Sequence, residues 1–130
     1  MGLQRIDNIG IGVRDVRASA EFWRERVGLA VDESFDGEPP SIAVHVGGQY
    51  LYVFQSTGAG TVRHEPSLSE NPLGLDHVSF TVDDVDEEYA RLAADGVAFD
   101  AEPESVEAWG IRLAPFRDPD GNLFYLVQPL

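Results

Sequence analysis

The sequence predicts an α+β fold in which two βαβββ modules form a curved mixed sheet around a shared cleft. The first observation is a repeat, because residues 6–16 (IDNIGIGVRDV) match residues 75–85 (LDHVSFTVDDV) at most apolar and aspartate positions. The second is that residues 48–55 (GQYLYVFQ) match residues 121–128 (GNLFYLVQ). Matches at both ends of two similar segments indicate an internal duplication. We therefore predict a single domain over residues 1–130, built of a module at 3–56, a linker at 57–74 and a module at 75–130.

The first module is predicted to contain a strand, a helix and three further strands. Its first segment alternates, with Ile9, Ile11 and Val13 on one face, which is the period of a half-buried strand. Asp15 then offers a helix N-cap, and Gly28 offers a C-terminal stop. A Gly-Gly pair predicts a hairpin turn between the last two strands. The predicted strands are residues 3–13, 29–35, 41–46 and 50–55.

The second module repeats this order after a linker rich in Gly, Ser and Pro. Asp84 is the predicted N-cap, Glu87 completes a capping box, and Gly96 ends the helix. Residues 118–121 (DPDG) form a turn signature before the last strand. The predicted strands are residues 75–82, 98–102, 109–117 and 122–128.

Composition excludes several classes of function. The 130 residues contain no cysteine, so thiol nucleophiles and zinc–thiolate sites are excluded. The net charge of −14 disfavours nucleic acid as a partner and favours cationic ligands. A second explanation of the charge is that an acidic surface keeps the protein in solution. No signal peptide or long apolar segment is visible, so we expect no membrane association and a cytoplasmic location.

Strand parity predicts which side chains line the cleft, because one face of each sheet must be apolar under its helix. The other face is aromatic and apolar with a few polar groups, which is typical of a small-molecule pocket. In the second module it is predicted to include Ser79, Tyr125 and Val127, and Ile111 and Leu113 join it if the parity assigned to their strand is right. The candidate ligand-binding residues on it are Asn8, Gly10, His45, Tyr50, Phe54, Trp109 and Leu123. Glycines 10 and 12 either leave room for a ligand or mark a bend or bulge in the strand.

The repeated motifs also resemble those of the vicinal oxygen chelate superfamily. The matching residues are Asp76, His77, Val82 and Asp84 in the opening "D-H-x-x-x-x-V-x-D" strand, and Phe116, Asp118–Asn122 and Leu126 in the closing "F-x-D-P-D-G-N-x-x-x-L" segment. This family includes glyoxalase I, extradiol dioxygenases, methylmalonyl-CoA epimerase, fosfomycin-modifying enzymes and bleomycin-resistance proteins. The resemblance implies the glyoxalase/bleomycin resistance/dihydroxybiphenyl dioxygenase fold.

The resemblance further implies where a divalent metal would bind. In metal-dependent members the ligands are typically His, Glu or Gln, His and Glu, and the equivalent positions here hold Asn8, Tyr52, His77 and Tyr125. Only His77 fits, because a phenol with a pKa of about 10 must lose a proton to ligate a metal. We therefore expect no cofactor. A divalent metal, if bound, would use His77 with Asn8 or His45, and His64 is a third imidazole for such a site.

Two functions follow from these observations. The first is a metal-free binding module, like the bleomycin-resistance branch with its antibiotic resistance, that sequesters an aromatic or cationic small molecule. The alternative is a glyoxalase-like lyase, isomerase or epimerase. In it His77 is the acid or base, and Tyr52 or Tyr125 donates a hydrogen bond to a developing oxyanion. The resemblance also implies a homodimer. No phosphate-binding glycine loop or Gly-x-Ser-x-Gly motif is present, so a nucleotide cofactor or serine hydrolase is not expected.

Overall fold

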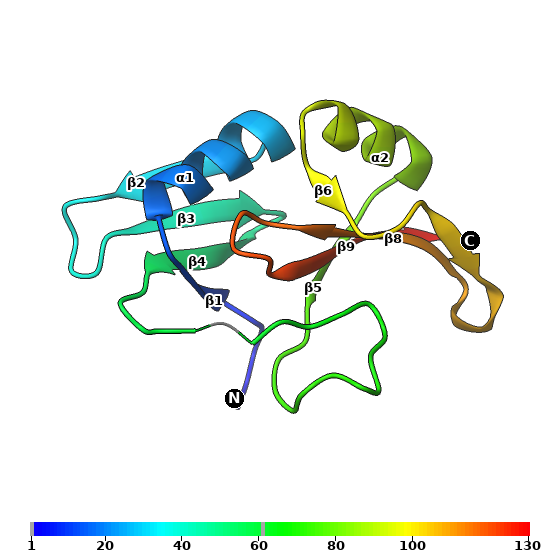
Figure 1. The fold of residues 1–130 in the computed structure, drawn as a ribbon, viewed down its shortest axis with the longest axis horizontal. Coiled ribbons are helices and arrows are strands. Elements are labelled where there is room, and N and C mark those ends of the chain that lie inside the picture. The colour runs from blue at the N-terminus through cyan, green and yellow to red at the C-terminus, as the bar shows by residue number, and fades with distance from the viewer. Residues whose placement is uncertain (1, 61) are drawn as a thin grey trace. The chain divides into compact units, whose positions relative to one another are not determined.

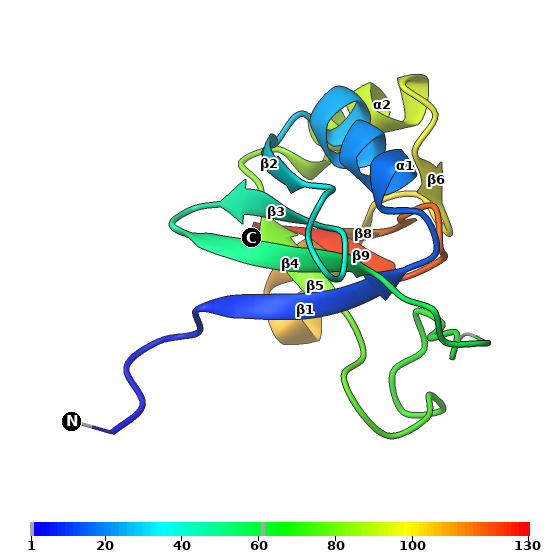
Figure 2. The same cartoon turned by 90° about the vertical axis from the view of Figure 1, so that its left-hand side faces the viewer.

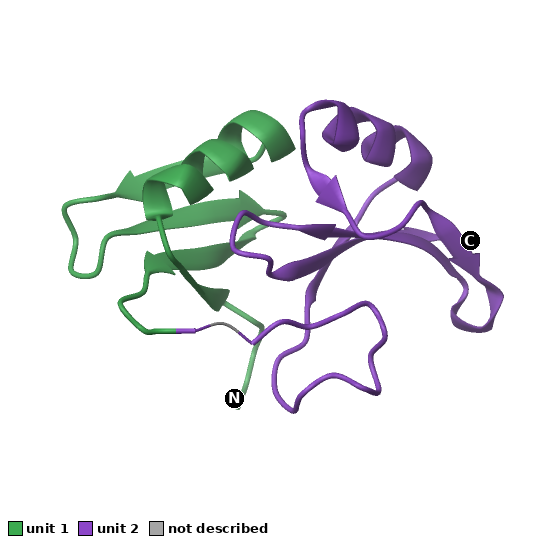
Figure 3. Ribbon diagram, in the orientation of Figure 1, with its two compact units in different colours: residues 1–59 green, residues 60–130 purple. Residues whose placement is uncertain are grey.

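The structure is a computed structural model that describes residues 2–60 and 62–130. The chain divides into two compact units, residues 1–59 and residues 60–130 (Figure 3). Each unit has a mixed sheet and few helices, so the predicted α+β class and the duplicated order of elements are confirmed. Residues 60–74, predicted as linker, group with the second unit. Among the described residues, no helix is long and apolar enough to cross a membrane.

Unit 1 is a four-stranded sheet with one helix on a single face (Figures 1 and 2). The strand order is β1-β4-β3-β2, with β1 parallel to β4 and the other pairs antiparallel. Asp15 caps the helix by accepting hydrogen bonds from the backbone N–H groups of Arg17 and Ala18, and Gly28 ends it at φ 90°. The elements are β1 (Asn8–Val13), α1 (Val16–Glu21), a π-helical continuation (Phe22–Val27), β2 (Ala30–Ser34), β3 (Ser41–Val46) and β4 (Gln49–Gln55).

Unit 2 repeats this topology, with strand order β5-β9-β8-β6 and β5 parallel to β9. Its core under the helix is aromatic, because the rings of Phe80, Phe99 and Phe124 all pack around Phe116, which is fully buried. The elements are β5 (Val78–Thr81), α2 (Val85–Ala94), β6 (Ala98–Phe99), β7 (Glu104–Val106), a 3₁₀ turn (Glu107–Trp109), β8 (Ile111–Arg117) and β9 (Leu123–Pro129).

Several predicted strand boundaries in the sequence are wrong. The first strand of each unit starts later than predicted, at Asn8 and at Val78, although the apolar pattern extends further back. The strand predicted over 98–102 stops at Phe99, and an additional strand, β7, pairs with β8. Trp109 belongs to the 3₁₀ turn that precedes β8, because Gly110 adopts a left-handed conformation with φ 66° and redirects the chain.

The closing glutamine of each sequence repeat has a structural role. In unit 1 the Gln55 Oε1 accepts a hydrogen bond from the Val16 N–H at 3.2 Å. In unit 2 the Gln128 Oε1 accepts one from the Val85 N–H at 2.8 Å. Each glutamine therefore joins the last strand of its unit to the first turn of the helix, where N–H groups lack intrahelical partners. This shared hydrogen bond gives a physical reason for the repeat.

We expect Gln55→Ala and Gln128→Ala each to lower the free energy of unfolding by about 1 kcal/mol, since each removes one part-buried hydrogen bond. Urea denaturation of both single variants measures the loss. Gln4→Ala, which changes an exposed glutamine outside both sheets, is the control. Unchanged stability in both strand variants would contradict the role assigned to these side chains.

Candidate functional site

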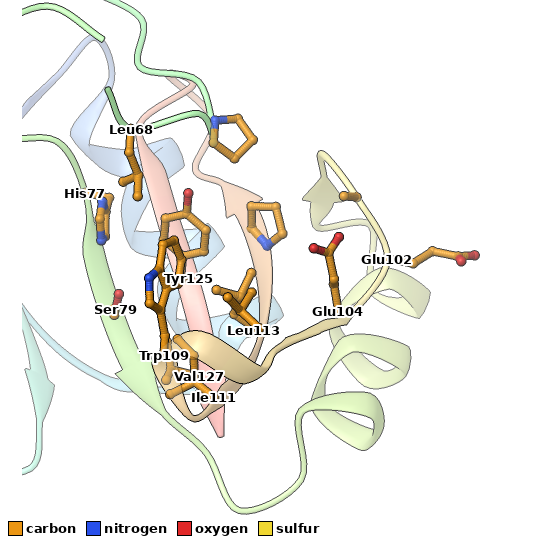
Figure 4. A pocket seen from close by; sticks show the side chains of 14 residues that line it. Leu68, His77, Ser79, Glu102, Glu104, Trp109, Ile111, Leu113, Tyr125 and Val127 are labelled. Carbon is orange, nitrogen blue, oxygen red and sulfur yellow. The ribbon is translucent and has the colours of Figure 1, made fainter. Parts of the chain in front are cut away.

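Unit 2 contains a pocket of about 430 Å³ on the face of its sheet opposite the helix (Figure 4). The strand face predicted from parity supplies most of the walls, since Ser79, Ile111, Leu113, Tyr125 and Val127 all line it. The alternate side chains of β8 and β9, such as Ala114 and Phe116, are fully buried on the helix side. The full lining is Pro66, Leu68, His77, Ser79, Ala101, Glu102, Glu104, Val106, Trp109, Ile111, Leu113, Pro115, Tyr125 and Val127.

His77 and Tyr125 meet at one end of this pocket. Their rings make an edge contact with 4.6 Å between centroids. The His77 Nδ1 lies 2.7 Å from the Asp76 Oδ2, and the His77 side chain is 27% exposed. A carboxylate can only accept a hydrogen bond, so this contact places a proton on Nδ1 and leaves Nε2 of the neutral imidazole as an acceptor.

The electrostatics around this pair involve Asp76 and Tyr125. Burial acts to raise the pKa of Asp76, but hydrogen bonds from His77 and Asn71, with the charges of His77 and His64, outweigh it and lower that pKa. Burial raises the pKa of Tyr125, and the nearby Asp76 carboxylate raises it further. The Tyr125 phenol therefore keeps its proton at neutral pH and acts as a hydrogen-bond donor.

One wall of the pocket comes from the segment that precedes β5. Pro66 and Leu68 contribute to the lining, and the backbone nearby is held by the buried Arg117 guanidinium. Arg117 donates to the His64 carbonyl at 2.6 Å and to the Gly121 carbonyl at 3.0 Å. The position of this wall therefore depends on a side chain from β8 that is itself outside the pocket.

Acidic groups lie at the rim of the pocket. Glu104 on β7 points toward the pocket, whereas Glu102 points outward (Figure 4). Trp109 also lines the pocket and is 57% exposed, which is a large exposure for the largest apolar side chain. None of the residues that line the pocket is an arginine. The pocket is therefore mainly apolar, with the polar groups of His77, Ser79 and Tyr125 inside and glutamates at its rim.

Five predicted site residues belong to the sheet of unit 1 and form contacts there. The His45 Nε2 lies 2.8 Å from the Asp32 Oδ2, and the Tyr50 hydroxyl donates to the Asp7 Oδ2 at 3.4 Å. The Tyr52 and Phe54 rings stack with 5.6 Å between centroids. Asn8 is exposed and donates to Asp7. A cleft shared between this face and that of unit 2 stays a prediction.

The space around Gly10 and Gly12 does not require glycine, because a Cβ at either position would make only ordinary van der Waals contacts. A Cβ at residue 12 would lie 3.5 Å from the ring of Phe54, its neighbour across the parallel β1–β4 pair. A Cβ at Gly10 would lie 3.9 Å from the same ring. Leu123, predicted to bind ligand, is buried and does not line the pocket of unit 2.

The residues at the inherited metal positions do not fit a divalent metal. Of Asn8, Tyr52, His77 and Tyr125, only His77 is an effective ligand, and the raised pKa of Tyr125 makes its phenolate harder to form. His45 is hydrogen-bonded to Asp32 in unit 1. Over residues 2–60 and 62–130, no three His, Asp or Glu side chains group closely enough to hold an ion.

We therefore predict that the purified protein carries less than stoichiometric zinc, nickel, iron or manganese. The measurement is elemental analysis by plasma mass spectrometry on wild type and His77→Ala, both prepared without chelator. About one metal ion per chain in the wild type, absent from the variant, would contradict this expectation.

Sequence reasoning missed three residues that line this pocket, Leu68, Glu104 and Val106, and the hydrogen bond of Asp76 that orients His77. Asp76 directly precedes His77 in the repeated motif, so the sequence itself could have indicated the hydrogen bond between their side chains. Glu104 and Val106 lie on β7, which the alternation pattern did not reveal because the strand has only three residues. Leu68 lies in a segment without periodicity, and no pattern in the sequence marks its contact with the pocket.

Comparison with known proteins identifies the family. The model of the Glyoxalase/Bleomycin resistance protein/Dioxygenase superfamily matches residues 5–126. The uncharacterized protein YraH of Bacillus subtilis is 31% identical over 121 residues, which cover 91% of this chain and 93% of that protein. A glyoxalase family protein from Enterococcus faecalis superposes with a TM-score of 0.76 at 27% identity, covering 98% and 99% of the two chains.

A genomically encoded fosfomycin resistance protein from Listeria monocytogenes has the same fold, with a TM-score of 0.73 at 17% identity over 98% of this chain and 95% of that one. The family match covers nearly the whole chain and agrees with the duplicated motifs and the repeated sheet topology. The chain therefore belongs to the glyoxalase/bleomycin resistance protein/dioxygenase superfamily.

Proposed function

We propose that this protein binds a small cationic molecule with an aromatic or planar apolar group in the pocket of unit 2, without using a metal ion. The observation that carries the proposal is the composition of the pocket, with aromatic and aliphatic walls, a glutamate at the opening and no arginine in the lining. Aromatic faces attract cations, and a carboxylate beside them adds to the attraction. An anion would find no arginine or lysine in this lining, and His77 is the one lining side chain that can carry a positive charge.

The net charge of −14 supports the same ligand class through long-range attraction. It cannot by itself provide selectivity, because it attracts every cation to every part of the surface. Local placement of Glu104 and Trp109 provides the selective element, since both line the pocket.

Three probes of similar shape test this proposal: benzyltrimethylammonium, its neutral isostere neopentylbenzene, and the anion benzylphosphonate. Tryptophan fluorescence reports binding, because Trp109 is exposed at the pocket and Trp23, 1% exposed, lies in the core of unit 1. We expect the cation to bind at least about tenfold more tightly than the neutral probe, and the anion not to bind measurably. Equal affinities for the cation and the neutral isostere would contradict the proposal.

Two charge variants separate local recognition from general attraction. Glu104→Gln removes the carboxylate at the pocket, and Glu38→Gln removes an exposed carboxylate in unit 1 with the same change in net charge. We expect only Glu104→Gln to weaken binding of benzyltrimethylammonium. Similar weakening in both variants would show that overall charge, and not the pocket, attracts the cation.

The second candidate function is proton transfer by His77. The observation that favours it is the 2.7 Å contact between the His77 Nδ1 and the Asp76 Oδ2, which leaves Nε2 able to accept a proton. Tyr125, which keeps its proton, would donate a hydrogen bond to oxygen as negative charge develops. This arrangement suits removal of a proton from carbon next to a carbonyl group.

Phenacyltrimethylammonium, a cationic aryl ketone, tests this second function. Its exchange of the proton next to the carbonyl in D₂O is followed by NMR with wild type, His77→Asn and Tyr125→Phe. Catalysis is supported if wild type accelerates this exchange over buffer and His77→Asn does not. The exchange rate with wild type should also show a pH dependence that the His77→Asn variant lacks. Equal exchange rates with wild type and His77→Asn would leave ligand binding as the function of the pocket.

We also propose a homodimer, which rests on the behaviour implied by the family resemblance. Light scattering at micromolar concentration tests it. A monomer mass would contradict it.

A further inference from the structure

The wall of the pocket beside His77 is a closed loop, residues 65–71, which we call the cover loop. The Asn71 side chain joins its two ends, because its Oδ1 accepts from the Glu65 N–H at 2.9 Å and its Nδ2 donates to the Glu65 carbonyl at 2.7 Å. Inside the loop, the Ser67 N–H donates to the Glu65 carbonyl and the Asn71 N–H donates to the Leu68 carbonyl. The amide of one side chain therefore closes the whole loop.

Leu68 lies in the middle of the cover loop and lines the pocket. Its φ of 54° is left-handed, and it is the one non-glycine residue with positive φ in the described part of the chain. A branched aliphatic side chain rarely adopts this conformation, which persists only where the surrounding structure holds it. The bonds of Asn71 hold the loop in the shape that presents Leu68 to the pocket.

The same asparagine also reaches the candidate acid–base pair. The Asn71 Nδ2 donates a second hydrogen bond, 2.7 Å long, to the Asp76 Oδ1. The other oxygen of that carboxylate contacts the His77 Nδ1. A primary amide has two N–H donors, and both are used here, on a carbonyl and on a carboxylate. Those partners only accept, so the orientation of the amide is determined by chemistry.

One continuous set of hydrogen bonds thus runs from the cover loop through Asn71 and Asp76 to His77. His64 lies beside this set without a hydrogen bond to it, because its Nε2 is 3.9 Å from the Asp76 Oδ1. That nitrogen is buried and has no hydrogen-bond partner. Asp76 is therefore held on one side by the loop and on the other by the imidazole that faces the pocket.

We propose that Asn71 is a positioning residue that couples the cover loop to the imidazole of His77, so that a ligand in contact with Leu68 changes the hydrogen bonding of His77. The ligand-dependent half of this inference rests on the proposed binding function of the pocket. The half that concerns Asn71 and His77 is a property of the protein without ligand.

The first experiment needs no ligand. Nitrogen-15 chemical shifts report the tautomer of His77, and hydrogen exchange of the Glu65 amide reports closure of the loop, in wild type, Asn71→Ala, Asn71→Asp and Ser69→Ala. We expect faster Glu65 exchange in Asn71→Ala and a change in the His77 nitrogen shifts in both Asn71 variants. Asn71→Asp is isosteric, but it places a second carboxylate against Asp76. Ser69→Ala, an exposed change in the same loop, should match wild type.

These readouts separate coupling from a purely local role. Faster exchange at Glu65 with unchanged His77 shifts would overturn the proposal, since Asn71 would then only close the loop. Thermal unfolding of each variant shows whether it is folded. If Asn71→Ala unfolds, the comparison of Asn71→Asp with Ser69→Ala decides the matter in the same way.

The second experiment adds benzyltrimethylammonium. In wild type we expect saturation to shift the His77 nitrogen resonances, and in Asn71→Ala we expect about tenfold weaker binding because the loop must be ordered on binding. Leu68→Gly relieves the positive φ and removes the side chain, so it should abolish the shift of His77 on saturation. Binding by wild type with unmoved His77 resonances would overturn the coupling. Absence of binding by wild type would instead contradict the proposed function, and the first experiment would still test Asn71.

Discussion

Arg117→Met is expected to lower the free energy of unfolding by about 3–5 kcal/mol, since it breaks a buried ion pair by removing one partner. Arg117 is 5% exposed, and its Nη2 and Nε both donate to the Asp100 carboxylate. The substitution would leave the Asp100 carboxylate with the Arg63 guanidinium, 3.9 Å away, as a cationic neighbour. Methionine retains most of the side-chain volume, so the loss reports lost polar contacts more than a cavity. Urea denaturation at pH 7 measures it.

Arg112→Met is the matched control, because Arg112 makes a similar two-bond contact with Asp86 at the surface. Exposed ion pairs contribute little, so we expect a much smaller loss of stability. Equal losses in the two variants would contradict the importance assigned to burial of Arg117.

The loss in Arg117→Met should also depend on pH. The hydrogen bond from Arg117 outweighs burial and holds the pKa of Asp100 below its usual value. The ionised carboxylate therefore contributes stability above its unfolded pKa of about 3.9, and that contribution is lost as pH falls through the lower folded pKa. The difference in free energy of unfolding between wild type and Arg117→Met should therefore become smaller below about pH 4. Urea denaturation curves recorded between about pH 2 and 7 measure it.

The fold was predictable because local patterns and the duplication agree. The aspartate N-caps at residues 15 and 84 and the Gly47–Gly48 turn were all identified from residue types with one dominant structural role. Strand β7 was missed because three residues are too few to show a period of two. The boundary at Ile111 depends on the left-handed Gly110, which the sequence shows only as one glycine among several.

The candidate site was only partly predictable, for a related reason. Parity placed His77, Tyr125 and Ile111 on the correct face, because it requires only that the opposite face be buried. Parity says nothing about loops. The contact from Arg117 to the His64 carbonyl joins positions 53 residues apart and ends on a backbone atom, which carries no sequence signal. The contact from Asn71 to Asp76 joins two side chains at the end of a segment that has no periodicity.

Trp109→Ala is expected to weaken binding of benzyltrimethylammonium by at least about tenfold, because an aromatic face over a cation is among the strongest contacts that a small pocket offers. Trp109 lines the opening of the pocket and is 57% exposed, so its removal should leave the stability of the core almost unchanged. Isothermal titration calorimetry, which does not need the tryptophan as a reporter, measures the affinity.

Two further variants make this result specific to the indole ring. Trp109→Phe keeps an aromatic face that attracts cations less strongly than indole, so its affinity should fall between those of wild type and Trp109→Ala. Leu73→Ala removes a fully exposed apolar side chain of unit 2 that does not line the pocket, and it should bind as wild type does. Neopentylbenzene provides the last comparison, because it has the same shape without the charge. If Trp109→Ala weakens the neutral probe as much as the cation, the indole contributes apolar contact alone, and the cationic ligand class would have to rest on Glu104.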